Sequence, residues 1–427
     1  MLKISKKSPK FVKTIIFVLL LVFIVALCIF AYLFYQKKVT GSSSLVNTQV
    51  RLPILNTKNT LSESHNTFGF NLLKVIREKE TNINIVISPS SIALALSMTY
   101  NGADNETKKA MAKALEIKGF DVEEVNRQNA ALISDLQNPD PNVEISIANS
   151  IWGKQGEKFK LAFLDENDKY YGAKIEYLDF SNPRSADTIN TWISDKTKGK
   201  ISQMLQPPLP SDIIMCLINA VYFKGIWTDE FDKKFTTDRD FYFSNTLKRK
   251  IPMMSKYEED FNYLENNLFQ AVYLPYGKNK RLRMFVFLPK KNISNFVSNL
   301  NITNWNKWLS LFTEREGRLY LPKFKIEYDT SLKNPLTTLG MGIAFSTGAD
   351  FTKIAPNMLI SEVAHSTFIE VNEQGTEAAA ATVVLMAPGG FSEDKSFNME
   401  VNKPFFFAIE DSKTGEIIFT GIITEPK

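Results

Sequence analysis

The stretch that decides the fold runs from residue 365 to residue 390 and reads HSTFIEVNEQGTEAAAATVVLMAPGG. It begins with a strand pattern at His365–Val371 and continues past Gly375 into small residues. A surface helix over Glu377–Ala387 is the alternative, because alanine is the best helix former. The following residues disfavour it, since Thr382 to Val384 are β-branched and Pro-Gly-Gly comes next. An extended segment is therefore predicted.

With the two-residue period of a strand, this segment presents one face of small side chains. That face consists of Thr376, Ala378, Ala380, Thr382 and Val384. Glu377 lies on the other face, and Gly375 supplies a hinge where the chain changes direction. Such a segment can lie exposed as a loop or slip between existing strands, because its side chains present little steric obstacle.

The rest of the chain predicts an α+β fold with a large sheet and no internal repeat. Helical spacing occurs at Phe68–Ile76 and Ile92–Asn101, and Ser88–Ser91 can cap the second of these helices. Strand patterns occur at Ile83–Ile87, 143–151, Ile213–Phe223, Leu282–Leu288, Leu319–Ile326, Phe405–Ile409 and Glu416–Ile423.

Enzyme chemistry finds little support. The two histidines, His65 and His365, have no metal-ligand spacing, and no nucleophile elbow or phosphate loop occurs. We expect a solvated His65, a hydrogen-bonded core His365 and a buried structural thiol at Cys216. No catalytic residue, metal or cofactor is predicted.

The motifs around the decisive stretch resemble those of the serpin family. The resemblance covers Thr60–Pro426 in the family's order, and its motifs are Ser88–Ser91, Asn190–Ile193, Thr197–Ile201, Asn219–Gly225 with Trp227, Glu373–Ala381 and Asn402–Phe407. It implies a serpin fold, with a large central β-sheet, further sheets, about eight or nine helices and an exposed reactive-centre loop at about 373–400.

The resemblance also implies a mechanism, suicide inhibition of a serine or possibly a cysteine protease. The protease cleaves the loop, and the freed hinge inserts into the central sheet as a strand, trapping the acyl-enzyme. Hinge residues by this resemblance are Glu373, Gly375, Thr376, Glu377, Ala378, Ala379, Ala380, Ala381 and Thr382. The places where the sheet opens, the shutter and the breach, match Ser88, Ser91, Asn219, Trp227, Lys323 and His365, with Lys323 as the partner of Glu373.

A non-inhibitory serpin-fold binding or chaperone protein is the alternative function. Insertion is disfavoured when a charged or bulky residue must enter the sheet. The small side chains on the face that would point inward therefore favour inhibition. The family's spacing puts the reactive bond between Gly389 and Gly390, with Met386, Ala387 and Phe391 as alternatives. A glycine there suits a protease with a narrow or shallow pocket, and we expect a monomeric inhibitor.

The N-terminal region predicts a membrane anchor. Ile15–Tyr35 is a run of 21 residues without a charge, enough to cross a hydrocarbon core of about 30 Å. Secretion after cleavage of a signal peptide is the alternative. It is disfavoured because cleavable signal peptides have a shorter apolar region and end at small residues. Five lysines precede the run and two follow it, which places the N-terminus in the cytoplasm.

This interpretation divides the chain into four parts. They are a cytoplasmic basic tail at 1–14, a transmembrane helix at 15–35, a flexible linker at 36–59 and an extracytoplasmic serpin domain at 60–427. Without the seven flanking lysines the chain has 44 basic and 46 acidic residues, which argues against a nucleic-acid partner.

Overall fold

The first described helix, α2 (Leu61–Lys79), begins at a capping box. The Thr60 hydroxyl accepts a hydrogen bond from the amide of Glu63, and the Glu63 carboxylate accepts one from the amide of Thr60. The computed structural model describes residues 60–244, 246–376 and 396–427. The predicted tail, membrane helix and linker, the hinge positions from Glu377 onward and every candidate scissile position lie outside these residues.

Nine α-helices occur in the described ranges. After α2 they are α3 (Pro89–Tyr100), α4 (Asn105–Ala114), α5 (Val122–Gln137), α6 (Leu161–Tyr171), α7 (Ser185–Lys196), α8 (Ile293–Asn299), α9 (Ile302–Leu309) and α10 (Lys333–Leu336). Shorter helical turns lie at Lys233–Phe235, Thr337–Met341 and Gly342–Phe345.

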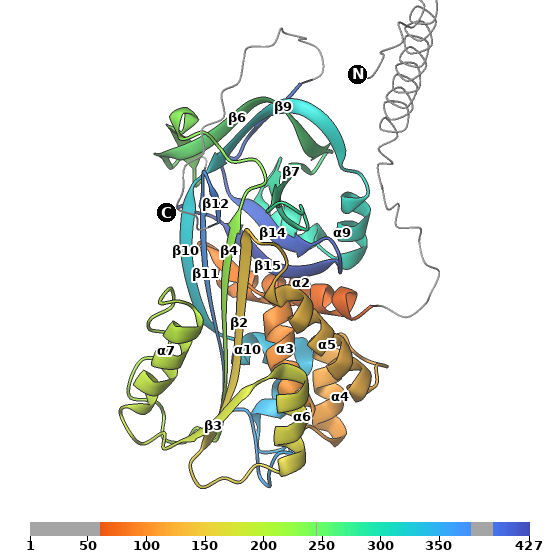
Figure 1. Ribbon diagram of the computed structural model, residues 1–427, viewed down its shortest axis with the longest axis vertical. Helices are drawn as coiled ribbons and strands as arrows, with labels where there is room; N and C mark the ends of the chain where they lie inside the picture. Colours follow the sequence, from red (N-terminus) through yellow and green to blue (C-terminus); the bar gives the residue numbers. More distant parts are fainter. Residues whose placement is uncertain (1–59, 245, 377–395) are drawn as a thin grey trace, which may run out of the picture. The chain divides into compact units, whose positions relative to one another are not determined.

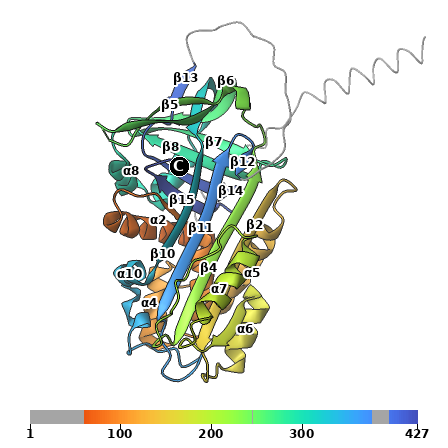
Figure 2. The same ribbon diagram turned by 90° about the vertical axis from the view of Figure 1, so that its left-hand side faces the viewer.

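A six-stranded sheet, called the central sheet below, runs along the molecule (Figures 1 and 2). In spatial order its strands are β10 (Phe324–Ser331), β11 (Glu362–Asn372), β12 (Gly375–Thr376), β4 (Met215–Ile226), β2 (Val143–Lys154) and β3 (Lys174–Leu178). One face carries α7, and the other faces α3 to α6 (Figure 1). Both faces are covered, which explains why β4 is almost continuously apolar and buried.

A nine-stranded second sheet packs beside α2, α8 and α9 (Figures 1 and 2). In spatial order its strands are β1 (Ile85–Ile87), β15 (Glu416–Ile423), β14 (Phe405–Asp411), β8 (Leu282–Pro289), β7 (Phe269–Tyr276), β6 (Lys248–Glu265), β9 (Thr313–Pro322) and β13 (Phe397–Glu400), and β5 (Thr237–Tyr242) pairs with β6. The α+β class with large sheets is confirmed.

The stretch predicted as one strand at Leu319–Ile326 is two strands in different sheets. β9 ends at Pro322, which has no amide hydrogen to continue the ladder, and β10 begins at Phe324. Lys323 lies between them, and its amide donates to the carbonyl of Pro252. The strand break therefore places Lys323 at the junction of the two sheets.

Two local predictions are wrong. His65 is buried rather than solvated, because the start of α2 packs on the start of β15, where His65 Nδ1 lies 2.9 Å from Glu416 Oε1. The serines at 88–91 do not cap α3 through their side chains. Helix α3 begins one residue after Ser88, at Pro89, so Ser91 lies within the helix.

Candidate functional site: the opening of the central sheet

The central sheet is open at one end, and the hinge begins there. β4 and β11 are parallel neighbours from the pair Cys216–Glu362 to the pair Tyr222–Phe368. Beyond that point β12 lies between them and runs antiparallel to both. Thr376 is opposite Gly225 on β4 and Val371 on β11. Two residues of the hinge thus already occupy the position of an additional strand.

Gly375 makes this close approach possible. Its φ is +144°, and a Cβ atom there would lie 2.0 Å from the carbonyl oxygen of Gly225. Backbone atoms cannot yield as a flexible side chain can, so only glycine fits this position.

Trp227 holds the turn between β11 and β12. Its backbone amide donates to the carbonyl of Gln374 (2.9 Å), and its indole Nε1 donates to the carbonyl of Asn372 (3.0 Å). The amide of Phe231 donates to the carbonyl of Glu373 (2.8 Å). The residues just after β4 therefore fix the chain direction at the start of the hinge.

An ion pair lies at the same end of the sheet. Lys323 Nζ lies 3.0 Å and 3.1 Å from the two carboxylate oxygens of Glu373, and the Thr236 hydroxyl donates to that carboxylate at 2.8 Å. The Glu373 side chain is 5% exposed. Burial by itself raises the pKa of Glu373, but hydrogen bonds from its own backbone, Lys323 and Thr236, with the Lys323 charge, outweigh burial and lower this pKa overall.

A second polar cluster lies midway along the sheet, where β4 and β11 still pair directly. Asn219 on β4 and His365 on β11 are opposite each other, and the Asn219 side-chain oxygen bonds to His365 Nδ1. The Asn219 amide donates to Ser91 on α3 and to Asn149 on β2. This network ties three strands and a helix together at the middle of the central sheet.

The hydrogen bonds of His365 define its tautomer. The amide of Ser88 donates to Nε2 (3.2 Å), so Nε2 is the acceptor and Nδ1 carries the hydrogen that is donated to Asn219. Complete burial lowers the pKa of His365 to about 3. The ring is therefore neutral at physiological pH.

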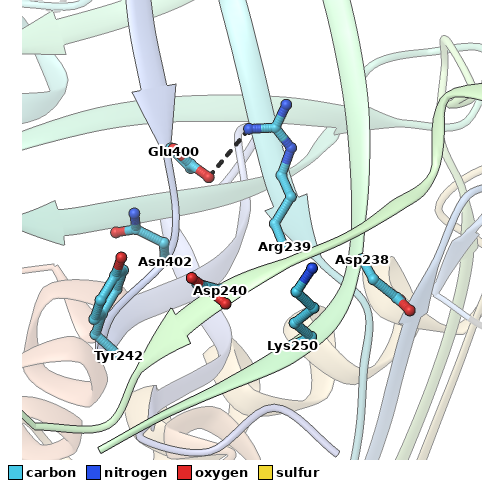
Figure 3. A pocket seen from close by; sticks show the side chains of 7 residues that line it. All are labelled: Asp238, Arg239, Asp240, Tyr242, Lys250, Glu400 and Asn402. Carbon is cyan, nitrogen blue, oxygen red and sulfur yellow. Dashed lines mark hydrogen bonds and ion pairs between the residues drawn. The ribbon is translucent and has the colours of Figure 1, made fainter. Parts of the chain in front are cut away.

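The first described strand after residue 395 is β13, which pairs with β9. A polar cleft of about 270 Å³ lies at this point, and Arg239 Nη1 on β5 is 3.2 Å from Glu400 Oε1 at the end of β13. Figure 3 shows the Arg239 side chain pointing toward Glu400. The Arg239 guanidinium also lies 3.8 Å above the Tyr320 ring. Partly buried ion pairs thus lie just before β12, at Glu373, and at the end of β13, at Glu400.

The structure brings the sequence-predicted residues together in two groups. Trp227, Lys323, Glu373, Gly375 and Thr376 meet at the open end of the sheet, and Ser88, Ser91, Asn219 and His365 meet at its middle. Thr236 and Tyr276 at the open end, and Asn149 at the middle, were not predicted. No local pattern marks them, because their contacts lie far away in the sequence. Cys216 is buried as expected, and burial raises the pKa of its thiol.

Known proteins resemble the chain over nearly all of the described part. The family model described as "Serpin (serine protease inhibitor)" matches residues 63–426. Serpin B6 of Pongo abelii is 34% identical, covering 86% of this chain and 99% of that protein, and the leukocyte elastase inhibitor of Equus caballus is 31% identical over the same shares. The native state of tengpin, a thermophilic serpin, matches 87% of this chain and 95% of its own, with 33% identity and a TM-score of 0.79.

No helix in the ranges 60–244, 246–376 and 396–427 is long and apolar enough to cross a membrane.

Proposed function

The chain belongs to the serpin family, and on that basis we propose that it inhibits proteases by inserting its cleaved loop into the central sheet. The observation that carries this proposal is the position of β12, which runs antiparallel between two parallel strands. An antiparallel strand can continue from there only by separating β4 from β11. The inhibitor needs no catalytic residue of its own, since the protease supplies the nucleophile.

The register of β12 defines where an inserting strand would lie. If an inserted strand kept this register without a shift, position 378 would lie opposite Phe223 and Ile369, position 380 opposite Val221 and Thr367, and position 382 opposite Asn219 and His365. These partner side chains are buried, so only small residues can enter between them. Alanine at 378 and 380 and threonine at 382 meet this requirement.

Insertion would provide the free energy that holds the protease. A strand of about 15 residues spans roughly 50 Å and gains ladder hydrogen bonds on both sides. The bond between Asn219 and His365 must break as position 382 passes, because these two residues now face each other directly. The Asn219–His365 network is therefore a barrier to insertion in the uncleaved protein.

A disulfide can test the register. Cysteines at Ala380 and Val221 should cross-link after an added protease has cleaved the loop, because facing residues of antiparallel strands have Cβ atoms about 4.5–5.5 Å apart. The matched control places cysteines at Ala381 and Val221, where the alternation of side chains puts the two on opposite faces. Cross-linking of the control, or of neither protein after cleavage, would contradict the proposed register.

The protease is proposed to be of the serine type, with a preference for small residues. Gly389 and Gly390 are the favoured reactive bond, and Met386, Ala387 and Phe391 are the alternatives. Mass spectrometry of the cleaved protein identifies the bond directly. A cut after a basic residue would contradict the specificity.

The N-terminal run Ile15–Tyr35 is proposed to anchor the protein in a membrane, with the serpin domain on the extracytoplasmic side. Its support is the length and charge pattern of the sequence. Protease added to intact cells should digest the linker and release the serpin domain, and the full chain should resist extraction by alkaline carbonate. A chain that carbonate extracts completely would contradict the anchor.

A further inference from the structure

Thr376, the last described residue of the hinge, makes a side-chain hydrogen bond that the sequence does not predict. The hydroxyl groups of Thr376 on β12 and Tyr276 on β7 are 2.8 Å apart. Neither residue is accessible to solvent. The bond therefore links the first inserted part of the loop to a strand of the second sheet, inside the core.

The position of the Tyr276 ring is fixed by its neighbours, so its hydroxyl would not move together with Thr376 if the hinge moved. Its ring stacks on Trp227 at 4.3 Å with an interplanar angle of 15°, and it meets the edge of Phe223 at 5.1 Å. A β-bridge joins the backbones of Trp227 and Tyr276. A Cβ atom at Gly225 would lie 2.8 Å from the Tyr276 ring, so the strand beside it is also in close contact.

The two hydroxyl groups depend on each other. Complete burial raises the pKa of Tyr276, so the phenol keeps its proton and can donate or accept. The only other polar contact of this hydroxyl among the described residues is a long one, 3.8 Å to the sulfur of Met284. Removing either hydroxyl leaves the other buried without an equivalent partner, which is more costly than removing both.

We propose that Tyr276 is a positioning residue of the inhibition reaction, because its hydroxyl holds Thr376 between β4 and β11. Insertion then starts with two residues in place and in a fixed register. This inference rests on the proposed function, since the hinge must insert before the acyl-enzyme is hydrolysed. Without this hydrogen bond the hinge begins to insert later. A larger fraction of the acyl-enzyme is then hydrolysed before it is trapped, and more active protease is released.

Three variants test the pair: Tyr276→Phe, Thr376→Val and the double variant. The phenylalanine keeps the stack on Trp227 and removes only the hydroxyl. Tyr273→Phe is the matched control, because Tyr273 is half-buried on the same strand and outside the hinge. Amide hydrogen exchange of the peptide covering residues 372–376 reports on the hinge without any protease. Pancreatic elastase serves as the probe for the stoichiometry of inhibition.

We expect each single variant to lose about tenfold in exchange protection of the hinge peptide and to raise the stoichiometry of inhibition. The double variant should recover most of both effects, and Tyr273→Phe should match the wild-type protein. The proposal would be overturned if the hinge peptide of both single variants exchanged as slowly as that of the wild-type protein. It would also be overturned if the effects of the two single variants simply added in the double variant. If Tyr276→Phe does not fold, Thr376→Val and the Tyr273→Phe control decide the question. Their exchange protection and their stoichiometry of inhibition are then compared with those of the wild-type protein.

Hydrogen exchange keeps this inference separate from the proposed function. A wild-type protein that forms no complex with elastase counts against inhibition of that protease, whereas the protection of the hinge peptide still supports or refutes the pair.

Discussion

The ammonium group of Lys323 lies within 3.1 Å of both carboxylate oxygens of Glu373, at the point where the central sheet opens. Lys323 is placed there by the break between β9 and β10, and Glu373 by the turn between β11 and β12. The contact joins segments 50 residues apart in the chain. We expect the pair to fix the turn that leads into the hinge and so to oppose further separation of β4 from β11.

Glu373→Lys should therefore promote premature loop insertion or polymerisation on moderate heating. The substitution places two cations together, at a cost between the roughly 0–1 kcal/mol of an exposed pair and the roughly 3–5 kcal/mol of a buried one. Native gels of heated samples provide the measurement. Glu327→Lys on the exposed face of β10 is the matched control. A monomeric and fully active Glu373→Lys protein would remove this pair from the mechanism.

Thr376→Arg should abolish inhibition and leave the loop cleavable. Thr376 is fully buried beside Tyr276, and a guanidinium cannot be desolvated there without a partner. Incubation with elastase should give cleaved inhibitor and no stable complex. Glu377→Arg provides the control, because the next residue of a strand faces the other way. Stable complexes with Thr376→Arg would show that inhibition does not require a small, uncharged side chain at this position.

His365 should make the folded protein less stable below neutral pH. Its pKa is about 3 in the folded state against about 6.5 unfolded, so only the unfolded chain takes up a proton between these values. The contribution of the neutral His365 ring to the free energy of unfolding is complete above about pH 6.5 and is lost as the pH falls toward about 3. At pH 5 the loss amounts to about 2 kcal/mol.

Urea unfolding at pH 7.5 and pH 5 measures this effect, with His365→Gln for comparison. Other titrating groups are common to both proteins, so the difference between their pH dependences isolates His365. We expect the wild-type protein to lose about 2 kcal/mol more than the variant. Parallel behaviour of the two proteins would contradict a neutral, buried ring.

A shortened chain that begins at Asn59 should be soluble and fully inhibitory. It keeps the capping box of Thr60 and Glu63 that begins α2. Thr60→Ala in this shortened chain should lower the free energy of unfolding by about 1 kcal/mol. Failure of the shortened chain to fold would show that the preceding residues belong to the domain.

The sequence predicted the fold class and most of the elements because hydrophobic periodicity and turn residues are local signals. It also identified His365, Asn219 and Lys323 through their family motifs. Periodicity could not show that Leu319–Ile326 divides between two sheets, since both halves are apolar strands. Tyr276 was missed for a related reason, because its partner Thr376 lies 100 residues away and only the folded sheets bring them together. His65 was mistaken for a solvated residue because its polar neighbours in the sequence conceal a buried contact with Glu416.

Cleavage of the loop should trap the protease covalently. The most direct test is to incubate the protein with pancreatic elastase and to separate the products by denaturing gel electrophoresis. We expect a one-to-one complex that survives SDS and boiling, together with release of the C-terminal fragment that follows the reactive bond. Complete cleavage of the loop without such a complex, by elastase and by a panel of serine proteases with small-residue specificity, would contradict it.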